Sequence, residues 1–357
     1  MNPSGVTNSP QPTKPGRSAR RQRIAFVSSG LGSAWGGIGV ASEMMVEALQ
    51  PDHDVRLWVN DARLPRSLRH ALVVSKAWVT GPPEFVFYGH VFLTALHRVT
   101  PRLRNVPYGV FLHGIEVWEP LREGHRRALE GATVLVTNSQ HTLDRARLAN
   151  PWMPEAHVAW LGVPVGSARQ EAGSQPPVAV IVGRIVSAER GKGHDEVLTA
   201  WPAVRAAVPA ARLLVVGEGD DRRRLERRIE AEKIGGVEFR GYVSDRERDV
   251  IYQQSRALLF PSRQEGFGLV LAEAAAHGLP SLAVRGSVFE ETFPEGHGVV
   301  FLQSTAPDEL APAIIRLLSD NAFASSAGNA AYDRTQAWFT KQRFMSRFRE
   351  ALRPLVP

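Results

Sequence analysis

The chain has 357 residues, with 43 lysines and arginines against 36 aspartates and glutamates, and it contains no cysteine. This length is sufficient for two or three domains with sizeable cores. The absence of cysteine excludes a disulfide scaffold, a zinc finger, an iron–sulfur protein and a thiol nucleophile. The formal net charge of +7 raises the question of a nucleic acid or an anionic membrane as partner.

The positive charge is unevenly distributed along the chain. Residues 1–170 carry 19 basic and 12 acidic residues, whereas residues 171–357 carry 24 of each. Residues 1–23 contain five of the cations, no acid and almost no apolar residue, so we expect a disordered basic tail there. The uncharged run 24–42 that follows holds five glycines and four serines, which are too many for a secretory signal or a membrane span.

Short apolar runs alternate with amphipathic segments from residue 24 onward, which is typical of parallel β-α-β units. In the first half we predict strands over 24–27, 54–59, 85–88, 108–112 and 133–136, with a helix over 38–49. After a polar connection at 164–177 the alternation starts again. Strands are predicted there over 178–182, 212–216, 237–240, 257–260 and 280–284, with helices over 194–207, 220–233, 245–254 and 268–277.

The alternation predicts an α/β protein with two doubly wound, Rossmann-like domains, over 24–168 and 169–335. Residues 336–357 are expected to add a docking helix, because Trp338, Met345, Phe348 and Leu352 recur at helical spacing. In such sheets, ligands bind beyond the carboxyl ends of the strands, where loops lead into helix N-termini. Four loops of this kind have an unusual composition.

The first of these loops, 30–39, reads GLGSAWGGIG and leads directly into a helix. Glycines let backbone N–H groups approach an anion, and the helix dipole favours a phosphate, although a tight turn explains the composition equally well. The second loop begins with His113, at the carboxyl end of the strand 108–112. A structural and a catalytic role for this histidine both stay open.

The third loop, 182–194, reads VGRIVSAERGKGH. Arg184 leaves a strand end, and Lys192 lies between two glycines just before a helix. Two cations at one helix N-terminus suit a diphosphate.

The fourth loop and its helix, 265–280, read EGFGLVLAEAAAHGLP. Glu265 can accept hydrogen bonds from sugar hydroxyls, the amides of 267–269 can hold phosphate oxygens, and Glu273 can hold a ribose diol. Because Glu273 lies in an otherwise apolar helix, its burial is costly unless it binds something. An Asp-His-Asp run at 52–54 resembles a metal motif, but it lies between a helix and a strand and is interpreted as a turn.

Glu265 and Glu273, with seven residues between them, resemble the signature of the retaining nucleotide-sugar glycosyltransferases of family 4, of the bacterial envelope and exopolysaccharide type. The resemblance extends to VGR…GKG at 182–193, LLVVGEG at 213–219, GYVS at 241–244, GGIG at 36–39, HG at 113–114 and TNS at 137–139. It covers nearly everything from residue 24 to about residue 345. It implies the GT-B fold, in which two Rossmann-like domains face a central cleft.

The resemblance also implies roles for individual residues. Arg184 and Lys192 would neutralise the donor diphosphate, Glu273 would hold the ribose, and His113 would touch the transferred sugar near its reacting end. The implied catalytic residues are His113, Arg184, Lys192 and Glu265, and the implied donor-binding residues are Gly36, Gly37, Arg184, Lys192, Glu265, Gly266, Phe267, Gly268, Leu269 and Glu273. Retention of anomeric configuration is implied, with a donor phosphate oxygen helping to deprotonate the acceptor. No metal and no other cofactor are expected, because Arg and Lys take the place of the metal.

The leading hypothesis is therefore a hexosyltransferase with GDP-mannose favoured over UDP-hexoses as donor. The acceptor, in the first domain, would be a polyprenyl-linked oligosaccharide or another glycan precursor. The arginine clusters 63–69 and 98–104 suit peripheral contact with the inner face of the cytoplasmic membrane, and ordinary solvated surface explains them equally well. The alternatives are a UDP-hexose transferase (glucosyl, galactosyl or GlcNAc) and a non-catalytic nucleotide-sugar or nucleic-acid-binding protein. Nucleic acid is not expected, because aromatic residues do not interleave with clustered cations outside the tail.

Overall fold

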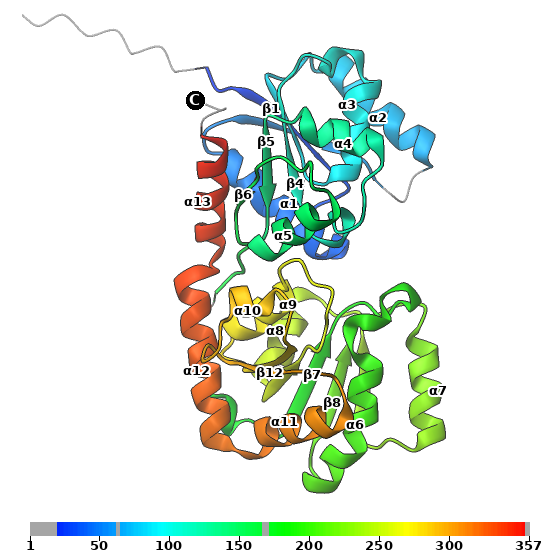
Figure 1. Ribbon diagram of the computed structural model, residues 1–357, viewed down its shortest axis with the longest axis vertical. Coiled ribbons are helices and arrows are strands. Elements are labelled where there is room, and N and C mark those ends of the chain that lie inside the picture. The colour runs from blue at the N-terminus through cyan, green and yellow to red at the C-terminus, as the bar shows by residue number, and fades with distance from the viewer. Residues whose placement is uncertain (1–19, 62–64, 166–170, 354–357) are drawn as a thin grey trace, which may run out of the picture.

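The computed structural model describes residues 20–61, 65–165 and 171–353, and it shows two α/β domains stacked end to end (Figure 1). The strands of the first domain are β1 (Arg23–Ser28), β2 (Asp54–Val59), β3 (Phe85–Tyr88), β4 (Tyr108–Leu112), β5 (Val134–Thr137) and β6 (His157–Val158). Its helices are α1 (Gly36–Leu49), α2 (Arg66–Val79), α3 (Ala95–Val99), α4 (Glu123–Glu130) and α5 (Gln140–Ala149). The strands pair in the order β2-β1-β3-β4-β5-β6, and every pairing is parallel.

The second domain repeats this architecture. Its strands are β7 (Val178–Val182), β8 (Arg212–Val216), β9 (Val237–Gly241), β10 (Ala257–Leu259), β11 (Ser281–Val284) and β12 (Val299–Leu302). Its helices are α6 (His194–Ala207), α7 (Arg222–Glu232), α8 (Asp245–Gln253), α9 (Leu269–Ala276), α10 (Phe289–Thr292) and α11 (Pro307–Ser319). The strands pair in the order β12-β11-β10-β7-β8-β9, again all parallel.

The predicted α/β fold with two doubly wound domains is confirmed. The strands β2, β3, β4, β7 and β8 and the helix α6 have the predicted bounds, and the other predicted central elements differ from theirs by one or two residues. These strands are readily predicted because helices cover both faces of the sheet, so they are almost continuous runs of apolar residues. Residues 24–27 and 178–182 illustrate this, since every one of them is buried.

The helical C-terminal region differs from its prediction. One helix was expected within 336–357, but the structure has α12 (Asn321–Trp338) and α13 (Lys341–Leu352), separated at Phe339. Phe339 is fully buried, and its carbonyl accepts a hydrogen bond of 2.8 Å from the amide of Val163 in the interdomain connection. Thr340 then caps α13, its side chain accepting a hydrogen bond from the amide of Arg343. This tertiary contact, which helical spacing cannot reveal, divides the helix.

The helix α13 returns to the first domain and packs along it (Figure 1). Phe344 and Phe348 are fully buried, and the ring of Phe348 meets that of Phe87 in β3 edge-on at a centroid distance of 5.0 Å. Lys341 forms a 2.6 Å ion pair with Glu47 of α1. The chain therefore crosses between the domains twice, once near Val163 and once near Phe339, and both crossings run side by side.

Most of the predicted basic tail, 1–23, lies outside the described residues, and its end differs from the prediction. Arg23 is the first residue of β1, where its amide donates to Glu84 at 2.9 Å. Over the part of the chain that the structure describes, each helix is too short or too polar to cross a membrane. Asp52 and His53 of the Asp-His-Asp run lie in the turn between α1 and β2, as predicted, and Asp54 is the first residue of β2.

Candidate active site

The donor-site residues predicted from the sequence gather around one cavity of about 320 Å³, which is lined by both domains. Those lining it are Gly36, Gly37, His113, Arg184, Lys192, Glu265, Gly266, Phe267, Gly268, Leu269 and Glu273. The first three come from the first domain and the others from the second. The structure thus brings every one of them together. Asn138 and Arg248, to which the sequence assigned no role, line the same cavity.

Glu265 and Lys192 meet directly in this cavity. The Nζ of Lys192 lies 2.5 Å from Oε1 of Glu265, and the hydroxyl of Ser262 donates to the same carboxylate oxygen at 3.0 Å. Both charged side chains are largely buried, with 21% of Lys192 and 14% of Glu265 exposed. The cation predicted for a diphosphate and the acid predicted for a sugar therefore neutralise each other in the free protein.

Two glycines of this loop, Gly266 and Gly268, are required for different structural reasons. Gly268 precedes α9 with a φ of +81°, and a Cβ there would lie 2.1 Å from the ring of Phe289. Gly266 contacts the other domain, because a Cβ on it would lie 1.8 Å from the carbonyl oxygen of His113. The side chain of Phe267 is buried against Phe339, so Phe267 can offer a ligand only its backbone. Glycine is needed both to start the helix and to bring the two walls of the cavity together.

Glu273 has partners within the protein that the sequence did not reveal. Its carboxylate forms a 3.2 Å ion pair with Arg248 of α8 and accepts a 3.3 Å hydrogen bond from the hydroxyl of Tyr252. Burial raises the pKa of Glu273 to about 6, although Arg248 acts in the opposite direction. The cost of burying this acid is thus partly met by Arg248 and Tyr252, and it does not by itself require a ligand.

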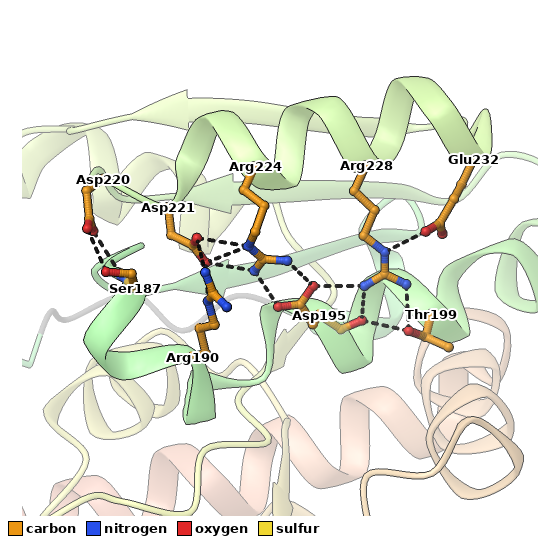
Figure 2. Close-up of polar contacts among 9 residues, drawn as sticks. All are labelled: Ser187, Arg190, Asp195, Thr199, Asp220, Asp221, Arg224, Arg228 and Glu232. Atoms are coloured by element: carbon orange, nitrogen blue, oxygen red, sulfur yellow. Dashed lines mark hydrogen bonds and ion pairs between the residues drawn. The ribbon is translucent and has the colours of Figure 1, made fainter.

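The loop that carries Arg184 and Lys192 is anchored at both ends of its turn (Figure 2). The amide and hydroxyl of Ser187 donate to Asp220 at 2.9 and 2.7 Å, and Arg190 donates two hydrogen bonds to Asp221 at 2.9 and 3.1 Å. We call residues 183–193 the cation loop. Its outer arginine, Arg184, pairs with Glu189, and its side chain is 71% exposed.

The anchor continues into a network of arginines and aspartates that joins α6 to α7 (Figure 2). Asp195 at the start of α6 accepts hydrogen bonds from Arg224 and Arg228 of α7, and Arg224 also bonds to Asp221. Hydrogen bonds from Arg224 and Arg228 hold the pKa of Asp195 below its usual range, and hydrogen bonds from Arg224 and Arg190 do the same for the pKa of Asp221. A shared network of this kind restricts the cation loop, which carries Lys192.

The ring, the amide and the carbonyl of His113 are all hydrogen-bonded within the first domain. Its Nε2 lies 2.7 Å from the carbonyl oxygen of Gly89, which can only accept, so this contact assigns the proton to Nε2. Its own amide donates to Glu116 at 2.5 Å, and its carbonyl accepts from the side chain of Asn138 at 2.6 Å. Burial lowers the pKa of the His113 ring. The ring is therefore neutral near pH 7, with Nδ1 as its acceptor.

Further hydrogen bonds join the two domains. The hydroxyl of Ser139, at the start of α5, donates to the carbonyl of Gly266 at 2.6 Å. Glu291 of α10 accepts hydrogen bonds from the amides of Gln140 and His141 at 2.8 and 2.7 Å, and from Nε1 of Trp160 at 2.5 Å. The positive end of α5 is thus capped by a carboxylate from the other domain.

Comparison with known proteins identifies the family. Residues 167–334 match the family model described as glycosyl transferases group 1. The chain is also 29% identical over 287 residues to a GDP-mannose-dependent alpha-(1-6)-phosphatidylinositol monomannoside mannosyltransferase of Mycobacterium tuberculosis, a match that covers 72% of each protein. Residues 167–334 are therefore a group 1 glycosyltransferase domain, and the chain has the GT-B fold.

Solved structures agree with the fold of this glycosyltransferase. Sucrose-phosphate synthase from Thermosynechococcus elongatus superposes with a TM-score of 0.77 at 21% identity, over 94% of this chain and 99% of that one. HepE from Anabaena, in a structure that contains UDP-glucose, superposes with a TM-score of 0.73 at 17% identity, over 94% of this chain and 100% of that one. The similarity extends over both domains, so the expected GT-B arrangement is confirmed.

Sequence reasoning missed several residues of the glycosyltransferase site. Asn138 lies in a quoted motif, but nothing in its type showed that it would hold the His113 carbonyl. Arg248 and Tyr252 lie on α8, and their spacing of four residues places both on one helical face, which could have indicated a shared partner. Glu291 gave no signal, because its partners come from the other domain.

Proposed function

We propose that this glycosyltransferase moves a hexose, with mannose favoured, from a nucleotide-diphosphate sugar to a glycan or lipid-linked acceptor, with retention of anomeric configuration. The observation that carries the proposal is the contact of Lys192 with Glu265 in the cavity between the domains. A cation that suits a diphosphate and an acid that suits sugar hydroxyls stand next to each other there. The preference for GDP-mannose is supported by the relative from M. tuberculosis, whose name states that dependence.

Donor binding would exchange the partners of the cavity's charged groups. In the free protein Lys192 pairs with Glu265, and Arg184 pairs with Glu189. The diphosphate would take over both cations, with the amides of Gly36 and Gly37 facing it from the first domain. Glu265 would then be free to accept hydrogen bonds from the sugar hydroxyls, and Glu273 from the ribose.

The chemistry follows from this charge arrangement. The bond between the anomeric carbon and the diphosphate oxygen breaks, and negative charge accumulates on the diphosphate. Lys192, which is largely buried in the cavity before the donor binds, stabilises that charge together with the exposed Arg184, and such stabilisation is usually a large contribution to catalysis. The acceptor oxygen forms its bond on the same face of the sugar, and its proton passes to a diphosphate oxygen. His113 contacts the sugar as a neutral ring. That no metal takes part in the reaction remains a prediction.

Peripheral contact with an anionic membrane also remains part of the proposal. Arg98, Arg102 and Arg104 are exposed on the first domain, and the guanidinium of Arg102 lies 4.1 Å from the ring centroid of Trp78, which is 54% exposed. In the other arginine cluster, 63–69, Arg63 lies outside the described residues. Binding to anionic vesicles at low salt, weakened by 0.5 M salt, is the expected result, and a protein that stays off such vesicles would remove this part of the proposal.

The test of the function is a panel of GDP-, UDP- and dTDP-sugars. Calorimetry should find that the sugars of one nucleotide bind at least tenfold more tightly than those of the other two nucleotides. NMR of the product should show that the transferred sugar keeps the anomeric configuration it had in the donor. Glu265→Ala should lower kcat at least 100-fold. Glu295→Ala, which changes a carboxylate that is 81% exposed, is the matched control. Full transfer by Glu265→Ala would overturn the role of that residue, and a failure to bind any nucleotide sugar would overturn the proposal.

A further inference from the structure

A second cavity, of about 850 Å³, adjoins the donor cavity on the side of the first domain. The glycine-rich loop 30–39 separates the two cavities. Gly36 and Gly37 line the donor cavity, Trp35 and Gly39 line the second one, and Ile38 lines both. We call the second space the first-domain cavity. A molecule inside it would lie next to a sugar held in the donor cavity.

One wall of the first-domain cavity is a row of rings. His90 stacks on His113 at a centroid distance of 5.7 Å and an interplanar angle of 21°. Phe92 follows at 4.9 Å from His90, and His125 lies 5.1 Å beyond Phe92. The row therefore leads from the donor cavity, which His113 lines, across the wall of the first-domain cavity. Phe92 is 54% exposed although it is fixed between two rings, so it presents a flat apolar surface to any occupant.

The charges of the first-domain cavity differ from those of the donor cavity. The donor cavity is lined by Arg184, Lys192 and Arg248 against two glutamates, whereas the first-domain cavity is lined by Glu116 and Glu119 against Arg122. Its two histidines add no positive charge near pH 7. Burial lowers the pKa of His90 to about 4, and burial together with Arg122 lowers that of His125. Carboxylates accept hydrogen bonds from hydroxyl groups but repel phosphates.

We propose that the first-domain cavity binds the acceptor as a neutral, hydroxyl-rich ring, a hexopyranose or a cyclitol, whose apolar face packs on Phe92. This inference rests on the proposed function and specifies the chemical class of its second substrate. Any phosphate of a lipid-linked acceptor lies outside the cavity, so the residue that receives the sugar is a neutral terminal ring. In the transfer, a hydroxyl oxygen of this ring bonds to the anomeric carbon as the diphosphate leaves, and the hydroxyl proton passes to the diphosphate.

The test uses the full-length enzyme and its best donor, and it compares neutral acceptor probes with phosphorylated ones. The neutral probes are octyl α-D-mannopyranoside, octyl β-D-glucopyranoside and myo-inositol, and the anionic ones are mannose 6-phosphate and myo-inositol 1-phosphate. At least one neutral probe should accept the sugar, with kcat/KM at least tenfold above that of either phosphorylated probe. Glu119→Lys, a change on the exposed rim, should reduce this ratio severalfold.

Substitution of Phe92 in the row of rings provides a second, independent test. Phe92→Ala should raise the acceptor KM about tenfold, because it removes the apolar surface, and Phe92→Tyr should restore it. Leu148→Ala, at a residue that is 85% exposed on α5, is the control for a surface truncation. The donor KM should differ by less than twofold among these variants, which separates the loss of an acceptor contact from misfolding.

Three outcomes would overturn the inference. They are a preference for the phosphorylated probes, an unchanged acceptor KM in Phe92→Ala, and hydrolysis of the donor without transfer to or binding of any neutral probe. A different result marks the failure of the proposed function itself. If the enzyme neither binds nor hydrolyses any nucleotide sugar, the donor assignment is wrong and the inference falls with it.

Discussion

Glu291 is the residue whose removal should change the relation between the domains most. Its carboxylate lies on α10 of the second domain and accepts three hydrogen bonds from the first domain, two of them from the N-terminal amides of α5. Its neighbour Glu290 bonds instead to Arg285 and to the amide of Gly286, within its own domain. The two adjacent acids therefore form a matched pair, one across the interface and one inside a domain.

The size of the effect follows from these contacts. Hydrogen bonds to a charged group contribute about 1.5–3 kcal/mol each when buried, and an anion at a helix N-terminus adds about 0.3–1 kcal/mol. Glu291 is half-buried, and water replaces its contacts when the domains separate, so much of this sum is lost. We expect Glu291→Ala to destabilise the closed arrangement by about 2–4 kcal/mol, which shifts the ratio of closed to open molecules about 30- to 1,000-fold.

The assay uses the absence of cysteine from the chain. Cysteines introduced at Leu148 and Tyr242, which are 85% and 67% exposed on different domains, carry spin labels for distance measurements. Glu291→Ala should broaden the distance distribution toward longer values in the free enzyme, and saturating donor should reverse part of the change. If Glu291→Ala and Glu290→Ala give the same distribution as the parent, the contacts of Glu291 do not hold the domains together.

Three further predictions concern the donor site and the C-terminal helix. Because burial raises the pKa of Glu273 to about 6, its carboxylate goes from about one-tenth to about nine-tenths ionised between pH 5 and 7, and calorimetric affinity for GDP-mannose should rise about tenfold over this range. A pH-independent affinity in the parent, or the same rise in Glu273→Gln, would contradict a ribose-binding carboxylate. Arg190→Ala frees the cation loop from Asp221, and since Arg190 is 54% exposed we expect a loss of about 1 kcal/mol, or about fivefold in donor Kd; an unchanged Kd would show that the anchor is dispensable. Phe348→Ala should lower the free energy of unfolding in urea by about 3–5 kcal/mol, against less than about 1 kcal/mol for Glu350→Ala on the exposed face of α13, and equal losses would place α13 outside the core of the first domain.

The sequence predicts those parts of the fold that local pattern determines. Central strands such as β7 are buried on both faces and carry an apolar residue at every position, so composition alone locates them. The division of the C-terminal helix at Phe339 is different in kind, because it depends on a backbone bond to Val163 that lies far away in the chain. Arg23 was assigned to the tail for a similar reason, since its place in β1 is stabilised by Glu84.

The grouping of the proposed donor-binding residues in one cavity could be predicted, because a nucleotide-diphosphate sugar would require residue types that are rare at those places. A diphosphate needs cations and free amides at a helix N-terminus, and Lys192 between two glycines meets that need without a common structural explanation. The partners that hold these residues, such as Arg248 for Glu273 and Asn138 for His113, are ordinary polar residues whose role arises only from packing. The same holds for Phe92, which looks like any aromatic residue until its exposure beside two histidine rings is known.

The two cavities explain why the net charge of the chain says so little about its chemistry. The donor is an anion and needs the cations of the donor cavity, whereas a neutral acceptor ring needs hydroxyl acceptors and no cation excess. Because residues of the loop 30–39 line both spaces, an anionic acceptor group in the first-domain cavity would compete with the donor diphosphate for Lys192 and Arg184. On the proposed assignment, the carboxylates of Glu116 and Glu119 would repel such a group and so prevent that competition. The charge difference across this loop would then direct each substrate to its own side, through local charges that the net charge of the chain does not reveal.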